Sequence, residues 1–218
     1  MKNRIALLLL VILVSAVGCT TNPLAWQFSV DRQAGTRFIP IELWSGDTWA
    51  GERTITPTKA DFTFGRRNHK TISGPFQWKH PITGETLWVY ERINETTRGT
   101  KRQLFTINPD GTGLAKVYDS RPDMPTRYFS TNAVLFPLGR WGKGEKRWFA
   151  FKEYVAGNTY DRRAMVYMRR LSFTYKETTY ALKYDWIMKD VNQNILFHER
   201  FIYGPGKSLM YFKNRLQQ

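Results

Sequence analysis

Hydrophobic and polar residues alternate along several stretches of the chain, in the two-residue repeat expected of a β-strand. Across residues 85–95, Leu87 and Val89 alternate with Trp88 and Tyr90. Alternation over this length is typical of a half-buried strand. No long stretch carries the 3.6-residue repeat of an amphipathic helix. Further strands are predicted at residues 38–44, 61–64, 103–107, 133–138, 147–154, 164–175, 179–189, 195–203 and 209–213.

The connections between these strands are short, which limits how neighbouring strands can be arranged. Residues 176–178 and 191–194 join predicted strands through a few polar residues, whereas a parallel return needs a dozen or more. Asn-Pro-Asp-Gly at 108–111 has the residue order of a type I turn followed by a glycine bulge. The predicted fold is all-β: an antiparallel meander that forms a β-sandwich or an open barrel, after an N-terminal signal helix.

The hairpin around the turn at 108–111 resembles a known repeat. The sequence from Gln103 to Tyr118, with Leu-Phe-Thr-Ile-Asn-Pro-Asp-Gly-Thr-Gly at its centre, resembles one hairpin of the TolB-type β-propeller repeats of periplasmic proteins. A propeller has several blades of about 40–45 residues with recurring signatures. Because the motif occurs once in this sequence, it supports a hairpin here and does not predict a propeller.

The first nineteen residues have the three parts of a secretory signal. Lys2 and Arg4 supply positive charge, residues 5–14 are uninterrupted by any polar side chain, and small residues fill 15–18 before Cys19. A charged start, an apolar core and a small-residue cleavage site define a signal peptide. The apolar run is too short to span a membrane comfortably, since a spanning helix needs about 20 apolar residues.

The end of this leader resembles the lipobox of bacterial lipoproteins. Ala16-Val17-Gly18-Cys19 is similar to the pattern Leu-(Ala/Ser)-(Gly/Ala)-Cys, with Ala16 where leucine is commonest. The resemblance implies cleavage before Cys19, a diacylglycerol on its sulfur and acylation of the new amino terminus. Thr20, which is not Asp, implies sorting to the outer membrane of a Gram-negative cell, facing the periplasm. The expected location is therefore the cell envelope, with a lipid anchor in the membrane.

The sequence predicts three consecutive parts. Residues 1–18 form the signal peptide, 19–37 a lipidated tether, and 38–218 the β-domain. A candidate boundary within the β-domain lies at 121–132, where two prolines interrupt the strand pattern. No motif in the β-domain identifies its family. Its length is sufficient for a sizeable hydrophobic core.

Composition narrows the chemistry of the exported part. Cys19 is the only cysteine, so disulfides and a cysteine nucleophile are excluded. The chain has 33 basic and 18 acidic residues, and the excess is larger in 140–218, with 16 basic and 7 acidic residues, than in 20–139, with 15 and 11. Such charge suggests an envelope protein, an anionic lipid or a glycan as partner. Export from the cytoplasm argues against nucleic acid as the partner.

Two arginine pairs in this basic half do not by themselves predict a binding face. Arg162-Arg163 and Arg169-Arg170 both lie in a predicted strand. Adjacent residues of a strand point to opposite faces. We therefore expect each pair to be divided between the two faces of the sheet.

Residues suited to metal binding or catalysis are not arranged in recognisable motifs. His69, His80 and His198 lie far apart, and none has the spacing of a metal-ligand set. The sequence has no Gly-x-Ser-x-Gly elbow, no Ser-x-x-Lys and no glycine-rich phosphate loop. The sequence therefore predicts no catalytic residue, metal or cofactor.

One basic segment is a candidate for binding an anionic surface. Residues 139–148 combine three glycines, four cations and two tryptophans. Indoles favour interfaces between apolar and wet surroundings, and cations near an anionic surface add roughly 1 kcal/mol each. In the alternative interpretation, both tryptophans fold back into the core. The candidate residues are Trp141, Lys143, Lys146, Arg147 and Trp148.

Three functions remain open from sequence. The favoured one is an outer-membrane lipoprotein whose β-domain binds or scaffolds a partner without catalysis. The alternatives are a glycan- or peptidoglycan-binding module and a carboxylate-dependent hydrolase. For a sugar cleft, the suitable carboxylates are Glu42, Asp47 and Glu52, which flank Trp44 and Trp49.

Overall fold

The computed structural model describes most of the chain after residue 67. The described residues are 30–31, 36–39, 41, 53–55, 68–96, 99–175, 178–204 and 207–214. The predicted signal helix and the lipobox with Cys19 lie outside them, as do Glu42, Asp47 and Glu52. None of the described segments is a helix long and apolar enough to cross a membrane.

The described residues form two antiparallel sheets. Long strands joined by tight turns account for most of them. The strands are β1 (Val30–Asp31), β2 (Thr36–Ile39), β3 (Arg53–Ile55), β4 (Asn68–Lys79), β5 (Thr86–Thr96), β6 (Gly99–Ile107), β7 (Gly113–Arg121), β8 (Met124–Phe129), β9 (Val134–Pro137), β10 (Gly139–Gly142), β11 (Lys146–Val155), β12 (Asn158–Tyr175), β13 (Thr178–Lys189), β14 (Ile195–Gly204) and β15 (Lys207–Asn214).

The large sheet is a meander in which nearly every strand pairs with its neighbours in sequence. Its order is β15-β14-β13-β12-β11-β8-β7-β6-β5-β4-β3, and β9 pairs with β7 off this path. No described pairing joins β15 to β3, so the sheet does not close. A small sheet of order β1-β2-β10 completes the described structure. The predicted all-β antiparallel meander is confirmed.

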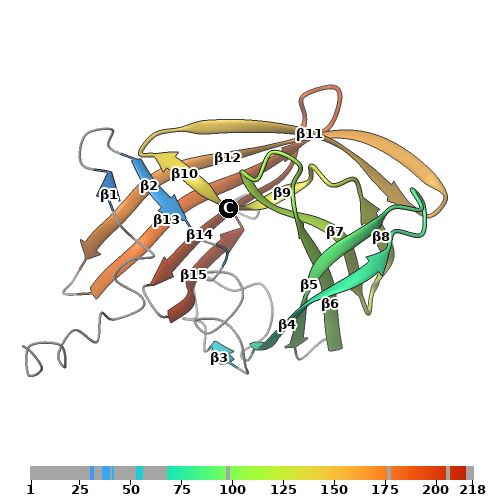
Figure 1. Ribbon diagram of the computed structural model, residues 1–218, viewed down its shortest axis with the longest axis horizontal. Coiled ribbons are helices and arrows are strands. Elements are labelled where there is room, and N and C mark those ends of the chain that lie inside the picture. Colours follow the sequence, from blue (N-terminus) through green and yellow to red (C-terminus); the bar gives the residue numbers. More distant parts are fainter. Residues whose placement is uncertain are drawn as a thin grey trace, which may run out of the picture.

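The large sheet curves so that two walls face each other across the core. In Figure 1, the cyan and green strands β4 to β8 form the first wall, and the orange and red strands β12 to β15 form the second. Strand β11 pairs with both β8 and β12 and so connects the walls. We call the face that bears the core the inner face, and the opposite face the outer face.

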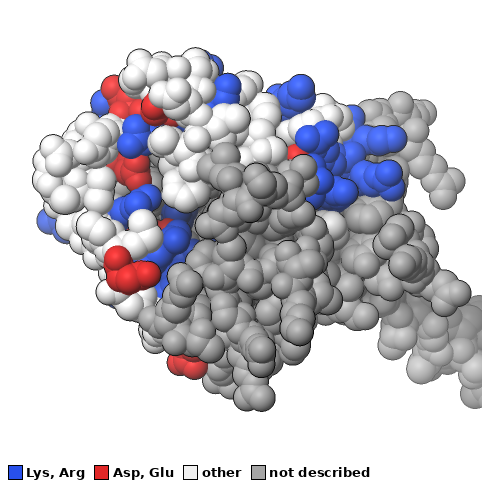
Figure 2. Space-filling view, turned by 180° about the vertical axis from the view of Figure 1, so that it is seen from behind, with Lys and Arg blue, Asp and Glu red and all other residues white. Residues whose placement is uncertain are grey.

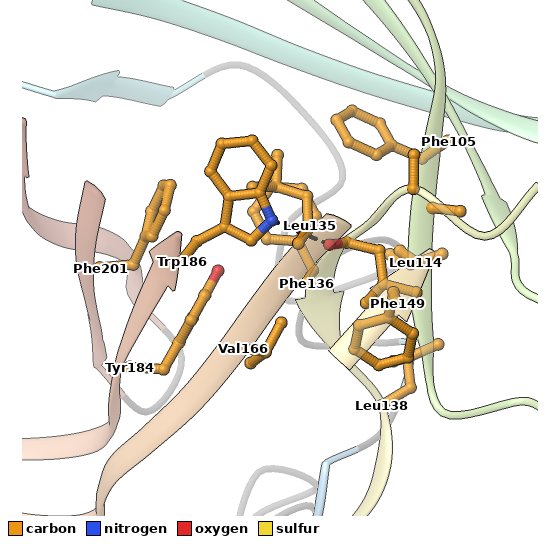
Figure 3. Close-up of a cluster of buried hydrophobic side chains, with 14 of the residues drawn as sticks. Phe105, Leu114, Leu135, Phe136, Leu138, Phe149, Val166, Tyr184, Trp186 and Phe201 are labelled. Atoms are coloured by element: carbon orange, nitrogen blue, oxygen red, sulfur yellow. Dashed lines mark hydrogen bonds between the residues drawn. The ribbon is translucent and has the colours of Figure 1, made fainter. Parts of the chain in front are cut away.

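Aromatic side chains from both walls meet around β9 (Figure 3). The ring of Phe136 lies 5.1 Å from that of Phe105 in the first wall and 6.2 Å from that of Phe201 in the second. The indole of Trp186 donates a hydrogen bond to the carbonyl of Val134 at 3.0 Å. Burial of such rings is worth about 1.5–3 kcal/mol each, so β9 stabilises the pairing of the two walls.

Several predicted elements agree with the structure, and others need correction. The turn at 108–111 is confirmed: Gly111 has a positive φ of 69° and its amide donates to the carbonyl of Asn108. Strand β4, which begins at Asn68, lies in a stretch where no strand was predicted. The candidate boundary at 121–132 contains β8, which pairs with both β7 and β11. Strands β1 and β2 begin within the range predicted as a tether.

Candidate functional site

The outer face of the second wall gathers basic side chains from four strands. Strand register places Lys146 opposite Tyr167, Tyr167 opposite Asp185, and Asp185 opposite Arg200. Asp185 is the one carboxylate in these rows among the described side chains. Figure 2, which shows this side of the molecule, has a dense group of basic residues with little acidic surface between them. We call this set the cationic face: Lys146, Arg163, Arg169, Arg170, Lys183, Lys189 and Arg200.

A β-bulge in β12 places two consecutive arginines on this face. The register shifts between Met168 and Arg170. Met168 is buried in the core and Leu171 packs against it, so Arg169 and Arg170 both point away from the core. The expected division of this pair between two faces is therefore wrong, because the extra residue of a bulge interrupts the alternation.

Asp185 is the centre of the cationic face. Its carboxylate accepts ion pairs from Arg169 at 2.8 Å and from Arg200 at 2.5 Å, and lies 3.5 Å from Nε2 of His198. The side chain has no exposed surface. Burial alone would disfavour the carboxylate, but the hydrogen bonds from Arg200 and Arg169 outweigh it and lower the pKa of Asp185.

The cations around Asp185 outnumber it. Lys183 lies close enough to Arg200 and Arg170 for their charges to disfavour its own. Burial, followed by these two arginines, lowers the pKa of Lys183, and Asp185 only partly compensates. Like charges held this close favour an additional anion. The arrangement therefore presents an excess of positive charge at the surface.

Trp148 lies at the other end of the cationic face. Its indole remains 42% exposed, with Arg163 5.3 Å and Lys189 5.5 Å from the ring centre. Nearby, Lys146 and Arg169 approach the ring of Tyr167 at 4.9 Å and 4.0 Å. Cations are attracted to aromatic faces, so the rings hold these side chains in place at the surface.

A groove of about 670 Å³ adjoins the Trp148 end of the cationic face. The turn between β13 and β14 forms one side of it, where Val191 is exposed. Lys152 and Asp161 face each other across β11 and β12 and form an ion pair at 3.0 Å. The groove thus combines apolar and charged lining and borders the cationic face at Arg163.

The residues predicted from sequence do not lie on one surface. Trp141 is fully buried, and its indole donates to the carbonyl of Leu138 at 2.8 Å. Arg147 lies over the Trp141 ring at 4.1 Å and pairs with Glu145. Lys143 is exposed in the turn after β10. Of the five candidate residues, only Lys146 and Trp148 belong to the outer face of β11.

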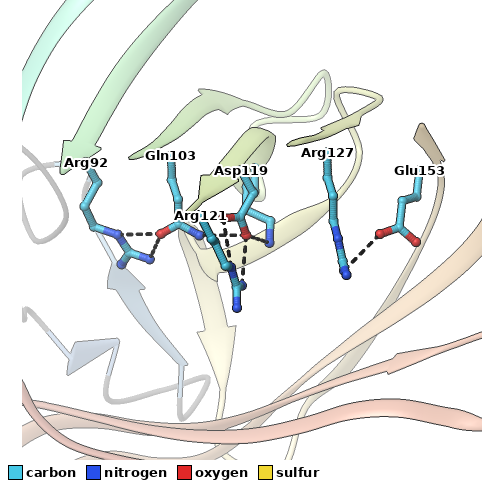
Figure 4. Close-up of polar contacts among 7 residues, drawn as sticks. Arg92, Gln103, Asp119, Arg121, Arg127 and Glu153 are labelled. Carbon is cyan, nitrogen blue, oxygen red and sulfur yellow. Dashed lines mark hydrogen bonds and ion pairs between the residues drawn. The ribbon is translucent and has the colours of Figure 1, made fainter. Parts of the chain in front are cut away.

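A second polar cluster lies on the inner face of the first wall (Figure 4). The guanidinium of Arg92 donates to the amide oxygen of Gln103, with Nε at 3.1 Å, and the Gln103 amide donates to Asp119 at 3.1 Å. Lys116 at 2.9 Å and Arg121 at 3.0 Å also pair with Asp119. Burial opposes the charge of Asp119, but these cations outweigh it and hold the pKa well below its usual range.

The inner polar row continues across the junction between the walls. Glu153 on β11 accepts from Arg127 of β8 at 3.3 Å and from Arg162 of β12 at 2.8 Å. Arg162 thus points inward, while Arg163 points outward to Trp148. The expected division of this arginine pair between the faces is confirmed.

The histidines occupy separate environments. His80 is buried, with Nε2 3.1 Å from the carbonyl of Phe129 and Nδ1 accepting from two backbone amides. His198 lies beside Asp185, and the side chain of His69 is outside the described part. Within the described residues, no group of three or more His, Cys, Asp or Glu side chains is placed to hold a metal ion.

An aromatic row crosses the outer face of the first wall. Strand register places Tyr128 opposite both Tyr118 and Tyr154. The rings of Tyr118 and Tyr128 are inclined at 56°, and those of Trp78 and Tyr118 at 63°. The rings are therefore tilted or edge to face, and do not form the flat, coplanar platform expected of a sugar-stacking surface.

Most of the cationic face was not found from sequence, because its members come from separate strands. The excess of basic residues after position 140 and the candidate segment that contains Lys146 and Trp148 pointed to this half of the chain. No protein-family model, curated protein or solved structure matches the chain.

Proposed function

We propose that this protein is an outer-membrane lipoprotein, anchored through Cys19 and facing the periplasm, whose β-domain binds anionic phospholipid headgroups without catalysis. The observation that carries the binding role is the crowding of Arg170, Lys183 and Arg200 near the carboxylate of Asp185. Their mutual repulsion is relieved when a phosphate group approaches. Binding of this kind needs no preformed cavity.

The composition of the cationic face favours a lipid surface as the partner. Trp148 and Tyr167 lie among the cations, and such amphipathic rings are favoured at the boundary between headgroups and acyl chains. Val191 and Ile195 are exposed at the adjacent turn. A lipid anchor at Cys19 would hold the domain beside a membrane, so each additional contact becomes effectively intramolecular.

The binding role is tested with vesicles and the domain without its leader. Vesicles containing phosphatidylglycerol are expected to bind the domain, whereas pure phosphatidylcholine vesicles are not. Replacing Arg170, Lys183 and Lys146 by Gln should weaken binding by roughly fivefold for each lost charge, because a cation near an anionic surface contributes about 1 kcal/mol. Sedimentation at 50 and 200 mM salt measures the effect.

A matched control distinguishes binding by the cationic face from attraction by the positive charge of the whole domain. Lys152→Gln removes a cation of the same sheet face that is already paired with Asp161, and it should leave vesicle binding unchanged. Equal binding of the triple variant and the original domain at low salt would contradict the proposal. So would equal binding to neutral and anionic vesicles.

The anchor is tested separately in a Gram-negative cell. The full chain should incorporate a labelled lipid precursor and fractionate with the outer membrane, and Cys19→Ser should do neither. A Cys19→Ser chain that still takes up label would refute the lipoprotein assignment. This result would leave the vesicle experiment unaffected.

A further inference from the structure

The inner polar cluster contains three side chains whose polar groups the protein does not satisfy. Lys101 and Asn94 are directly opposite each other on β6 and β5. The side-chain oxygen of Asn94 is buried without a hydrogen-bond partner. Neither the ammonium of Lys101 nor the carboxylate of Glu199 forms an ion pair with another described residue. A buried polar group without a partner costs about 1–3 kcal/mol.

These groups lie where the two walls face each other. Lys101 and Asn94 belong to the first wall, and Glu199 on β14 belongs to the second, opposite Trp186 of the core. Glu199 interacts electrostatically with Lys101, Lys116 and Arg121. Lys101 and Glu199 both lie deep within the protein, yet each residue keeps some solvent-accessible surface. Neither side chain is therefore fully packed into the core.

The cluster also has an excess of positive charge. It contains Arg92, Lys101, Lys116 and Arg121 against two carboxylates, Asp119 and Glu199. Arg92 is already held by Gln103 and lies 5.0 Å from the ring centres of Phe105 and Phe136. Lys116 and Arg121 are committed to Asp119. Lys101 is thus the cation with capacity for a ligand.

We propose that this inner cluster binds a small anion that also carries a hydroxyl group, with Lys101 and Asn94 as its direct partners. The anionic oxygens accept from the ammonium of Lys101, and the hydroxyl donates to the side-chain oxygen of Asn94. The other cations of the cluster stabilise the added charge. This site is on the opposite face from the proposed lipid-binding surface and does not depend on it.

Protonation of Lys101 links this site to pH. Burial, and then the repulsion of Arg121, Lys116 and Arg92, lowers the pKa of Lys101 to about 7, although Asp119 favours the charge. An anion favours the ammonium, so binding weakens as the pH rises above about 7. The charged groups that interact with Lys101 are Arg92 on β5, Lys116, Asp119 and Arg121 on β7, and Glu199 on β14. Tyr184 on β13 and Tyr203 on β14 interact in turn with Arg92 and Glu199.

Two anion pairs test the proposal, because the hydroxyl can be on the anion itself or on a carbon skeleton. Inorganic phosphate is compared with sulfate, and D-glucuronate with acetate, by calorimetry at pH 6.5. At least one hydroxyl-bearing probe should bind tenfold or more tightly than its partner without a hydroxyl. The pair that shows the preference identifies the source of the hydroxyl. Equal affinities within both pairs would overturn the proposal.

Three variants assign the binding to this cluster. Lys101→Gln should lower the affinity of the preferred probe at least tenfold, and Asn94→Leu should abolish the preference for the hydroxyl. Lys79→Gln, at an exposed position on β4, is the control and should bind like the original protein. Thermal unfolding shows that each variant is folded, and Asn94→Ser replaces Asn94→Leu if the latter is not. Full affinity in Lys101→Gln would refute the site.

Discussion

The inner and outer faces of the large sheet each arrange cations around one aspartate, but they do so differently. On the inner face, Asp119 receives Gln103, Lys116 and Arg121 at distances of 2.9–3.1 Å. On the outer face, Asp185 receives Arg169 and Arg200, whose side chains remain 37% and 18% exposed. Both carboxylates are themselves buried, but the protein surrounds Asp119 more deeply than Asp185. Arg169, on the outer face, is the most exposed of the four cations that pair with the two aspartates.

This difference separates stability from binding. When one partner of a buried ionic group is removed, the remaining charges have neither a counter-charge nor water around them. The inner row is therefore expected to matter mainly for folding. Exposed cations lose little when their partner is removed, because water and salt screen them. The outer cations therefore remain available for an external anion. Three substitutions test this contrast, in order of decreasing effect on stability.

Asp119→Asn is expected to cause the largest loss of stability. The substitution preserves size but removes the carboxylate closest to Lys116 and Arg121, and leaves Glu199 as the remaining counter-charge of these cations and Lys101. Removing one partner of a buried ionic group costs about 3–5 kcal/mol, and the partial exposure of Arg121 places the expected loss near 3 kcal/mol. Urea unfolding at pH 7 measures it.

The pH dependence provides a second measure of the same interaction. The pKa of Asp119 is lowered in the folded state, so its stabilising contribution is present above the unfolded value and is lost as the pH falls through the folded one. The difference between the original protein and Asp119→Asn should therefore shrink in acid. Asp123→Asn, at an exposed neighbouring position, is the control. A loss below 0.5 kcal/mol for Asp119→Asn would contradict the contrast.

Much of the fold could be predicted from sequence because strand periodicity and tight turns are local properties. The alternation at 85–95 and the turn at 108–111 both correspond to observed elements. Strand β8 was not predicted, because the prolines at 122 and 125 obscured a strand that is stabilised by pairing with β7 and β11. Its existence depends on residues distant in sequence, so no local pattern could reveal it.

The candidate sites were less predictable, since they depend on register. The bulge beside Met168 decides that Arg169 and Arg170 share a face, and nothing in the local sequence marks it. The Trp141 segment was chosen for its composition, yet burial of the Trp141 indole depends on its packing in the core. The meeting of Lys101 and Glu199 across the interior requires the curvature of the whole sheet.

Lys101→Met is expected to stabilise the ligand-free protein by about 2 kcal/mol at pH 7 or below. The folded pKa of Lys101, about 7, lies below its unfolded value of 10.5. The unfolded chain therefore binds more protons between these values, so the original protein gains stability as the pH rises from 7 to 10.5. At about 1.4 kcal/mol per pH unit, the whole pKa difference of Lys101 would correspond to more than 4 kcal/mol of stability. The expected gain is smaller because water reaches part of the Lys101 side chain and screens its charge.

Urea unfolding of both proteins between pH 6 and 10 tests this. The stability gain of Lys101→Met should be largest at pH 6 and should decrease towards pH 10. Lys79→Met, at an exposed position, should show no such trend. A destabilised Lys101→Met at pH 6 would mean that the ammonium has a stabilising partner in the folded protein.

Asp185→Asn is expected to have the smallest effect on stability and an opposite effect on binding. Its partners Arg169 and Arg200 can turn towards water, so the expected loss is about 1 kcal/mol, well below that at Asp119. The same substitution removes the one carboxylate that, among the described side chains of the cationic face, competes with an external anion. Vesicles containing phosphatidylglycerol should therefore bind the variant roughly fivefold more tightly than the original domain, since one unit of charge near an anionic surface contributes about 1 kcal/mol. If Asp185→Asn instead weakened vesicle binding while remaining folded, Asp185 would be required to position Arg169 and Arg200 for the ligand, and the outer face would resemble the inner one in needing its aspartate.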